Sequence, residues 1–123
     1  MNFKYLIVFI LCSYTALQAQ IEEVKVDNNT ARIFNNNGKY SGYYINLCSS
    51  CKLNGYNSNF IVITENNTAR IYDQKGSYTG YYINLCSSCN IKNVSSSNIL
   101  INEGNTTRYY NFKGTYTGNY TNN

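Results

Sequence analysis

A period of 38 residues constrains the fold of this 123-residue chain more than any other feature of its sequence. The decapeptide GYYINLCSSC occurs at 42–51 and again, letter for letter, at 80–89. The related stretches NNTARIF, NNTARIY and GNTTRYY begin at Asn28, Asn66 and Gly104, again 38 residues apart. Self-similarity at a fixed step of this size is typical of stacked supersecondary units. We therefore expect tandem copies of one small unit.

Each copy is predicted to fold as four short antiparallel strands joined by tight turns. In the middle copy, FIVIT, TARIY, SYTGYYINL and NIKNV are β-branched or alternating, with Tyr81, Ile83 and Leu85 on one face. The intervening NN suits a two-residue hairpin, DQKG suits a type I turn, and CSSC turns the chain. No helical apolar period continues past the first twenty residues. About 2.7 copies follow one another, at about 21–58, 59–96 and 97–123.

The predicted fold is therefore all-β, with one repeat domain over residues 20–123. Its copies could form a compact β-flower or prism, or resemble part of a propeller, whose blades are four-stranded meanders. We favour the compact closed form, because exposed sheet edges promote aggregation. The alternatives are a partial propeller completed by other copies of the chain, so that self-association stays open, and an open stack whose edges a partner covers.

The first twenty residues, MNFKYLIVFILCSYTALQAQ, have the layout of a secretory signal peptide. One lysine precedes the apolar run Leu6–Leu11, which is too short to span a bilayer, and small residues follow it. We expect residues 1–19 to be removed after Ala19, together with Cys12. The mature protein would be secreted, periplasmic or at the cell surface, with no membrane span.

Four cysteines remain after that cleavage: Cys48, Cys51, Cys86 and Cys89. Oxidising conditions outside the cytoplasm favour disulfides. The ends of a β-turn lie within bridging range, so each CxxC could close locally. Equivalent cysteines of neighbouring copies could pair instead, and two such turns could also supply four thiolates to zinc. A redox role fits poorly, since a reactive CxxC usually opens a helix. We expect the local pairs, with no cofactor.

The unit IYDQKGSYTGYYI resembles the Tyr-Asp-x-x-Gly hairpins of secreted bacterial β-repeat proteins. These include the wrapped shells of tyrosine-aspartate repeats and small β-flower or blade-repeat proteins of Bacteroidetes. The ending QAQ of the leader is also similar to exported proteins of that group. The resemblance covers the mature chain and implies a hairpin-repeat fold. It implies no catalytic residues, because those families share none.

Composition narrows the function. The chain contains no histidine, the usual base for a serine or cysteine nucleophile. Asp27, Glu65 and Glu103 recur once per copy beside hairpin turns, where acidic residues are common, so they do not indicate a catalytic pair. A net charge of +4, spread along the sequence, is too small to indicate nucleic-acid binding. We expect a protein that is not an enzyme.

Tyrosines and arginines recur at equivalent positions and are the candidates for a binding face. We favour structural packing for the tyrosines and a solvated or cross-strand pairing face for the arginines. The alternative is that alternation directs these tyrosines away from the core, where amphipathic rings could bind a glycan or a protein, although the absence of tryptophan counts against a glycan. The residues are Tyr40, Tyr44, Tyr78, Tyr82, Tyr116, Arg32, Arg70 and Arg108.

The sequence thus predicts an exported, non-enzymatic β-repeat protein, a structural or binding module held by disulfides. The alternative is a zinc-binding or thiol-redox protein that uses the paired CxxC motifs. The partner is not identified beyond the classes protein and glycan.

Overall fold

The structure is a computed structural model that describes residues 19–123, so the predicted signal peptide falls outside it except for Ala19. The described residues form eleven strands, and no helix in this part of the chain could cross a membrane. The strands are β1 (Glu23–Asp27), β2 (Thr30–Asn35), β3 (Lys39–Asn46), β4 (Cys51–Tyr56), β5 (Ile61–Glu65), β6 (Thr68–Tyr72), β7 (Tyr78–Asn84), β8 (Cys89–Val94), β9 (Ile99–Glu103), β10 (Thr106–Tyr110) and β11 (Tyr116–Asn122). The predicted all-β fold is confirmed.

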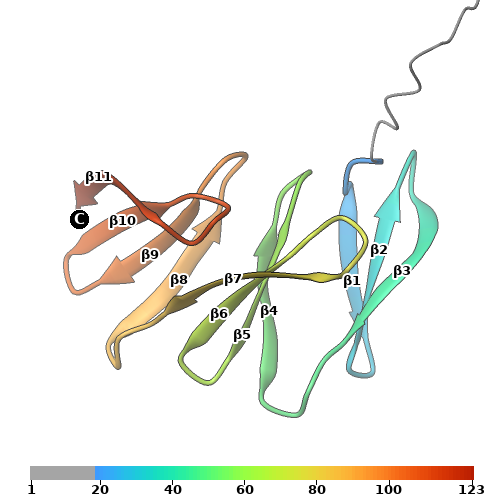
Figure 1. Ribbon diagram of the computed structural model, residues 1–123, viewed down its shortest axis with the longest axis horizontal. Helices are drawn as coiled ribbons and strands as arrows, with labels where there is room; N and C mark the ends of the chain where they lie inside the picture. Colours follow the sequence, from blue (N-terminus) through green and yellow to red (C-terminus); the bar gives the residue numbers. More distant parts are fainter. Residues whose placement is uncertain (1–18) are drawn as a thin grey trace, which may run out of the picture.

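Three antiparallel sheets follow one another along the chain (Figure 1). The first contains β1–β3, the second β4–β7 and the third β8–β11, each in sequence order. Each CSSC turn therefore joins two sheets. The segment NIKNV, which lies in β8, was expected to complete the sheet of its own repeat. Instead, β8 pairs with β9 of the next repeat. The sheet boundary thus lies several residues before the boundary drawn from the sequence.

The sheets form an open row, like consecutive blades of a propeller, and not the closed arrangement that we favoured (Figure 1). The apolar core agrees with this arrangement. It consists of two clusters, one between the first and second sheets and one between the second and third. The first cluster contains Ile21, Val24, Ala31, Ile33, Ile45, Ile61 and Ile63. The second contains Phe60, Val62, Ala69, Ile71, Ile83, Ile99 and Ile101.

The middle sheet is buried on both faces along β5. Ile61 and Ile63 pack into the first cluster, while Val62 between them packs into the second. Alternate residues of a strand point to opposite faces, so a continuous apolar run is what a strand between two layers requires. Full burial of such side chains is worth about 1.5–3 kcal/mol each.

Polar residues replace the apolar ones at both ends of the row. Glu23 and Lys25 stand in β1 where β5 has Ile61 and Ile63, and both are exposed. On the third sheet, Thr107 replaces the alanine found at this position in the other two copies, and it is buried. Its hydroxyl lies within hydrogen-bonding distance of Asn102 and Asn123. Polar outer faces are what terminal units of a repeat stack need for solubility.

The turns adopt the predicted chemistry. Asn28, Asn66 and Gly104, which open the two-residue turns, all have positive φ, as does Asn29. In the β6–β7 turn, the Gly76 N–H donates to the Asp73 carbonyl, which closes a type I turn.

One prediction about β7 is wrong. Tyr81 does not share the buried environment of Ile83, because it is 40% exposed whereas Ile83 is 6% exposed. Ladder pairing shifts between Tyr78 and Tyr82, and Gly80 within this bulge has φ +87°. A bulge breaks the strict alternation of faces on which the prediction rested.

Candidate functional site

The four cysteines form two local pairs. Cys48 lies at disulfide distance from Cys51, and Cys86 from Cys89, with Cα atoms 4.9 Å apart in both pairs. Each pair closes one CSSC turn, where the N–H of the second cysteine donates to the carbonyl of the first. The structure therefore brings together the cysteines of one turn, the first of the pairings that the sequence left open.

Each cysteine pair also has one carboxylate neighbour. The sulfur atoms of Cys48 and Cys51 and an oxygen of Glu65 lie within 4.8 Å of one another, and Glu103 is equivalent beside Cys86 and Cys89. These are the clusters of metal-ligating side chains among residues 19–123, and each combines two sulfurs with one oxygen. The four-sulfur site of the zinc alternative would need both turns together.

The three predicted arginines make cross-strand ion pairs. Arg70 pairs with Glu65, Arg108 with Glu103, and Arg32 with Asp27 at 3.5 Å. Glu65 lies diagonally across the β5–β6 ladder from Arg70, within reach of a long side chain. The hydrogen bond from Arg70 to Glu65 raises the pKa of Arg70 above its ordinary value. The arginines thus act first within their own hairpins.

The predicted tyrosines lie on the last strand of each sheet, which is β3, β7 or β11. Ten large hydrophobic side chains of the described region are exposed, and nine of them are aromatic rings on β3, β7, β11 or the turn before β11. The nine are between 39% and 59% exposed: Tyr40, Tyr43, Tyr44, Tyr78, Tyr81, Tyr82, Phe112, Tyr116 and Tyr120. All five tyrosines predicted from the sequence are among them. We call this set the outer aromatic edge.

A similar ring pair recurs in every sheet. Phe34 and Tyr40, Tyr72 and Tyr78, and Tyr110 and Tyr116 each have centroids 5.6 Å apart. The inner ring of the middle pair is partly buried, and this burial raises the pKa of Tyr72. Each pair therefore anchors one exposed ring on a ring held by the sheet. Such anchoring lowers the conformational entropy that a binding ring loses.

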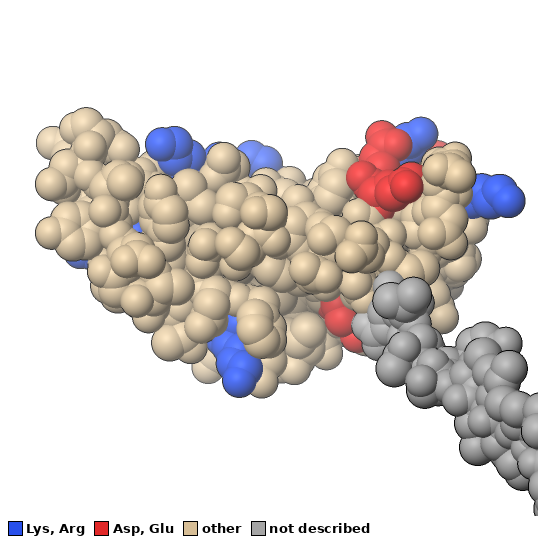
Figure 2. Space-filling model, turned by 90° about the horizontal axis from the view of Figure 1, so that it is seen from above, with Lys and Arg blue, Asp and Glu red and all other residues tan. Residues whose placement is uncertain are grey.

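Basic side chains accompany this edge. The Arg108 guanidinium lies 5.9 Å from the centroid of the Tyr116 ring, and the Lys113 ammonium lies 5.7 Å from that of Phe112. Figure 2 shows one face of the molecule, on which Lys and Arg side chains lie at separate places and most of the visible acidic side chains gather at one end.

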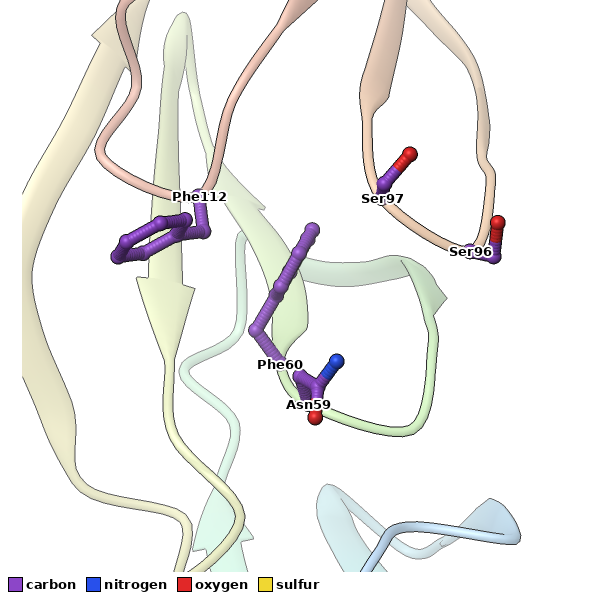
Figure 3. A pocket seen from close by; sticks show the side chains of 5 residues that line it. All are labelled: Asn59, Phe60, Ser96, Ser97 and Phe112. Atoms are coloured by element: carbon purple, nitrogen blue, oxygen red, sulfur yellow. The ribbon is translucent and has the colours of Figure 1, made fainter.

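A cleft between the second and third sheets was not predicted from the sequence (Figure 3). Its volume is about 330 Å³, in the range of small-ligand pockets. Phe112 reaches it from the β10–β11 turn, and Asn59 and Phe60 from the loop before β5. Ser96 and Ser97 close the opposite side. We call it the Phe112 cleft.

A second hollow of about 200 Å³ continues from the Phe112 cleft and shares Asn59, Phe60 and Phe112 with it. Tyr81 and Asp73 also line this hollow. The Tyr81 ring stands edge-on to the Phe112 ring, at 6.5 Å between centroids and 87° between planes. The cleft therefore joins the outer aromatic edge at Tyr81.

A hollow also lies between the first two sheets, at the place that corresponds to the second hollow, and different side chains line it. A smaller hollow of about 170 Å³ there is lined by Asn35, Tyr43, Gln74 and Lys75. By the 38-residue step, Gln74 is the counterpart of Phe112 and Asn35 that of Asp73. The departure from the repeat at 112 is the sequence signal that could have identified the cleft.

Comparisons with known proteins give a likeness in fold. No protein-family model matches the chain, and the search of curated proteins found no match. A crystal structure of a protein of unknown function from Bacteroides caccae is similar, with a TM-score of 0.53 and 15% sequence identity. The likeness covers 84% of this chain but 39% of that protein. The likeness concerns the fold alone.

Proposed function

We propose that this protein is an exported, non-enzymatic binding module whose outer aromatic edge binds a polysaccharide. In this proposal the cysteine pairs are disulfide staples that hold the turns between sheets. The observation that carries it is the recurrence of exposed aromatic rings on the last strand of all three sheets, two or three on each strand, with Phe112 in the turn before β11. A single exposed apolar residue is ordinary, whereas a group of them marks an interaction site.

The periodicity of the edge favours a polysaccharide over a protein. Tyr44, Tyr82 and Tyr120 occupy equivalent positions, each opposite an arginine in the neighbouring strand. Equivalent groups at a regular step match a ligand that is itself a repeating polymer. Aromatic faces carry negative charge density and attract the polarised C–H groups of a sugar ring. Several weak contacts to one polymer add through effective concentration.

Export and the absence of catalysis rest on the sequence. The leader has the three parts of a signal peptide. The chain has no histidine, and its acidic residues Glu65 and Glu103 are engaged with arginines. Cell fractionation followed by N-terminal sequencing tests export: the mature protein should begin at Gln20 outside the cytoplasm. Full-length protein retained in the cytoplasm would contradict this part of the proposal.

Polysaccharide binding is tested by sedimentation with cellulose, chitin, amylopectin, xylan and mannan, with the mature protein as the probe. The wild-type protein should bind at least one of them. The triple variant Tyr44→Ala, Tyr82→Ala, Tyr120→Ala should lose this binding while it unfolds in a cooperative transition. Val26→Ala, which changes an exposed apolar residue away from the edge, is the matched control and should bind as wild type. Binding to none of the five polymers, or a triple variant that binds normally, would contradict the proposal.

A further inference from the structure

We propose that the Phe112 cleft is a sugar subsite that takes one pyranose ring of the bound polysaccharide. This inference rests on the proposed function, because the cleft continues the outer aromatic edge through Tyr81. It adds a defined pocket, and a selective site, to an edge whose three strands are otherwise similar.

The phenyl ring of Phe112 is not needed by the turn that carries it. In that turn Gly114 N–H donates to the Asn111 carbonyl at 2.9 Å, and Lys113 N–H to the Asn111 side-chain oxygen at 2.9 Å. The turn at 73–76 makes the same two bonds with Gln74 in the place of Phe112. A glutamine therefore serves the fold at this position.

Phe112 is nevertheless 53% exposed, so much of the ring contributes nothing to the core. Burial of an aromatic ring releases free energy roughly in proportion to the apolar area removed from water. A ring that the turn does not require and the core does not cover can gain this free energy from a ligand. The geometry thus indicates a binding role for Phe112.

The walls of the cleft match the two kinds of surface on a pyranose. Phe112 offers aromatic carbon to the cleft, and Tyr81 offers it in the adjoining hollow, so the C–H face of a sugar ring can stack against them, while Phe60 lies at the base and is 5% exposed. Asn59, Ser96 and Ser97 offer amide and hydroxyl groups around the opening, which can bond sugar hydroxyls (Figure 3). The Ser97 hydroxyl already donates to the Asn98 side-chain oxygen at 3.1 Å, so a purely apolar ligand would leave the Asn59 amide and the Ser96 hydroxyl without partners, which costs free energy.

The hollow of about 170 Å³ between the first two sheets, here called the first hollow, provides a built-in comparison. Its Asn35, Tyr43 and Gln74 are the counterparts of Asp73, Tyr81 and Phe112, which line the second hollow beside the cleft, and it has no phenylalanine in its lining. We therefore expect one sugar subsite of this kind in the described residues, at the second inter-sheet boundary. The substitution Phe112→Gln converts the cleft to the chemistry of the first hollow, with a residue that this turn type already accommodates.

The test compares the mature wild-type protein, Phe112→Gln, and Gln74→Ala as the matched control at the first hollow. The probes are the methyl pyranosides of glucose, galactose, mannose and N-acetylglucosamine, with N-acetylphenylalaninamide as an apolar probe. Ligand-observed NMR should detect at least one pyranoside. Phe112→Gln should weaken its binding about tenfold, the effect expected for one aromatic contact, while Gln74→Ala leaves it unchanged. Tyr81→Asn, which introduces the residue found at 119, should weaken it as well.

The outcomes separate this inference from the proposed function. If wild type binds a polysaccharide and Phe112→Gln binds polymer and pyranosides equally well, the cleft assignment is wrong and the proposed function stands. The assignment is also wrong if N-acetylphenylalaninamide binds at the cleft and no pyranoside does. If wild type binds neither polymers nor pyranosides, both proposals are wrong.

Discussion

Gly76 of the second sheet lies directly against the backbone of Tyr44 in the first. A β-carbon at residue 76 would be 3.0 Å from the Tyr44 carbonyl oxygen and 3.1 Å from a side-chain carbon of Ile45. Gly114 repeats this relationship one step along, at 2.7 Å from the Tyr82 carbonyl oxygen. The turns between the last two strands therefore fasten each sheet onto the preceding one.

The first prediction concerns this contact. Gly76→Ala should destabilise the protein more than Gly80→Ala, although both residues have positive φ and both substitutions add the same atom. A β-carbon at Gly80 meets no atom within 4 Å, so its cost is backbone strain of about 1 kcal/mol. At Gly76 the close contact adds about 1–3 kcal/mol. Urea unfolding curves measure the difference, and equal losses would show that the sheets do not meet at this turn.

The second prediction concerns the cysteines. The mass of the purified mature protein should be about 4 Da below that of the fully reduced chain, because each disulfide removes two hydrogens. Reduction should lower stability by about 2 kcal/mol for each four-residue loop. Four free thiols with stoichiometric zinc in the isolated protein would contradict the staple role and favour the metal-binding alternative.

The third prediction concerns alkaline pH. Burial raises the pKa of Tyr72, so the folded state keeps this proton to a higher pH than the unfolded chain does. The free energy of unfolding should therefore be unaffected by this group below about pH 10, the ordinary tyrosine value, and should fall as the pH rises towards the folded pKa. Tyr72→Phe should make this alkaline decline shallower. An identical decline in wild type and Tyr72→Phe would refute the assignment.

The fourth prediction concerns the first sheet. Glu23 and Lys25 replace the isoleucines that β5 and β9 carry at the same positions, so the double variant Glu23→Ile, Lys25→Ile should create an apolar face. Such a face is expected to promote self-association. Sedimentation velocity should show a larger species that grows with concentration. The control Glu23→Gln, Lys25→Gln keeps the face polar. If the isoleucine variant sediments as this control does, the polar residues do not act as a cap.

Local chemistry made much of the fold predictable. The repeat step can be read directly from the sequence. The strands and turns depend on residues that are neighbours in the sequence, as in the turn at Asn66, which has a positive φ, and the Asp73–Gly76 turn. The sheet boundaries were harder to predict from the sequence. Strand β8 could pair with a strand of its own repeat or with β9 of the next, and contacts on the two sides of the CSSC turn decide between them. The exposure of Tyr81 depends on a bulge at Gly80, which the alternating pattern conceals.

The candidate site was predictable only in part. The tyrosine positions on the outer strands follow from the repeat, and all five are exposed. The Phe112 cleft combines three loops from two sheets, and no local pattern places them together. Its one sequence signal is a break in the repeat, phenylalanine where an earlier copy has Gln74. In a repeat protein, such departures deserve as much weight as the motif itself.

The most direct measurement is the affinity of the mature protein for oligosaccharides of increasing length, cut from the polymer that it binds best, by calorimetry. Neighbouring sheets pack about 10 Å apart, so a chain long enough to cross two of them should contact two tyrosine clusters at once. We predict that affinity rises steeply, at least about 100-fold, once this length is reached. Affinity that stays the same at every length, or no heat of binding with any of them, would contradict the account.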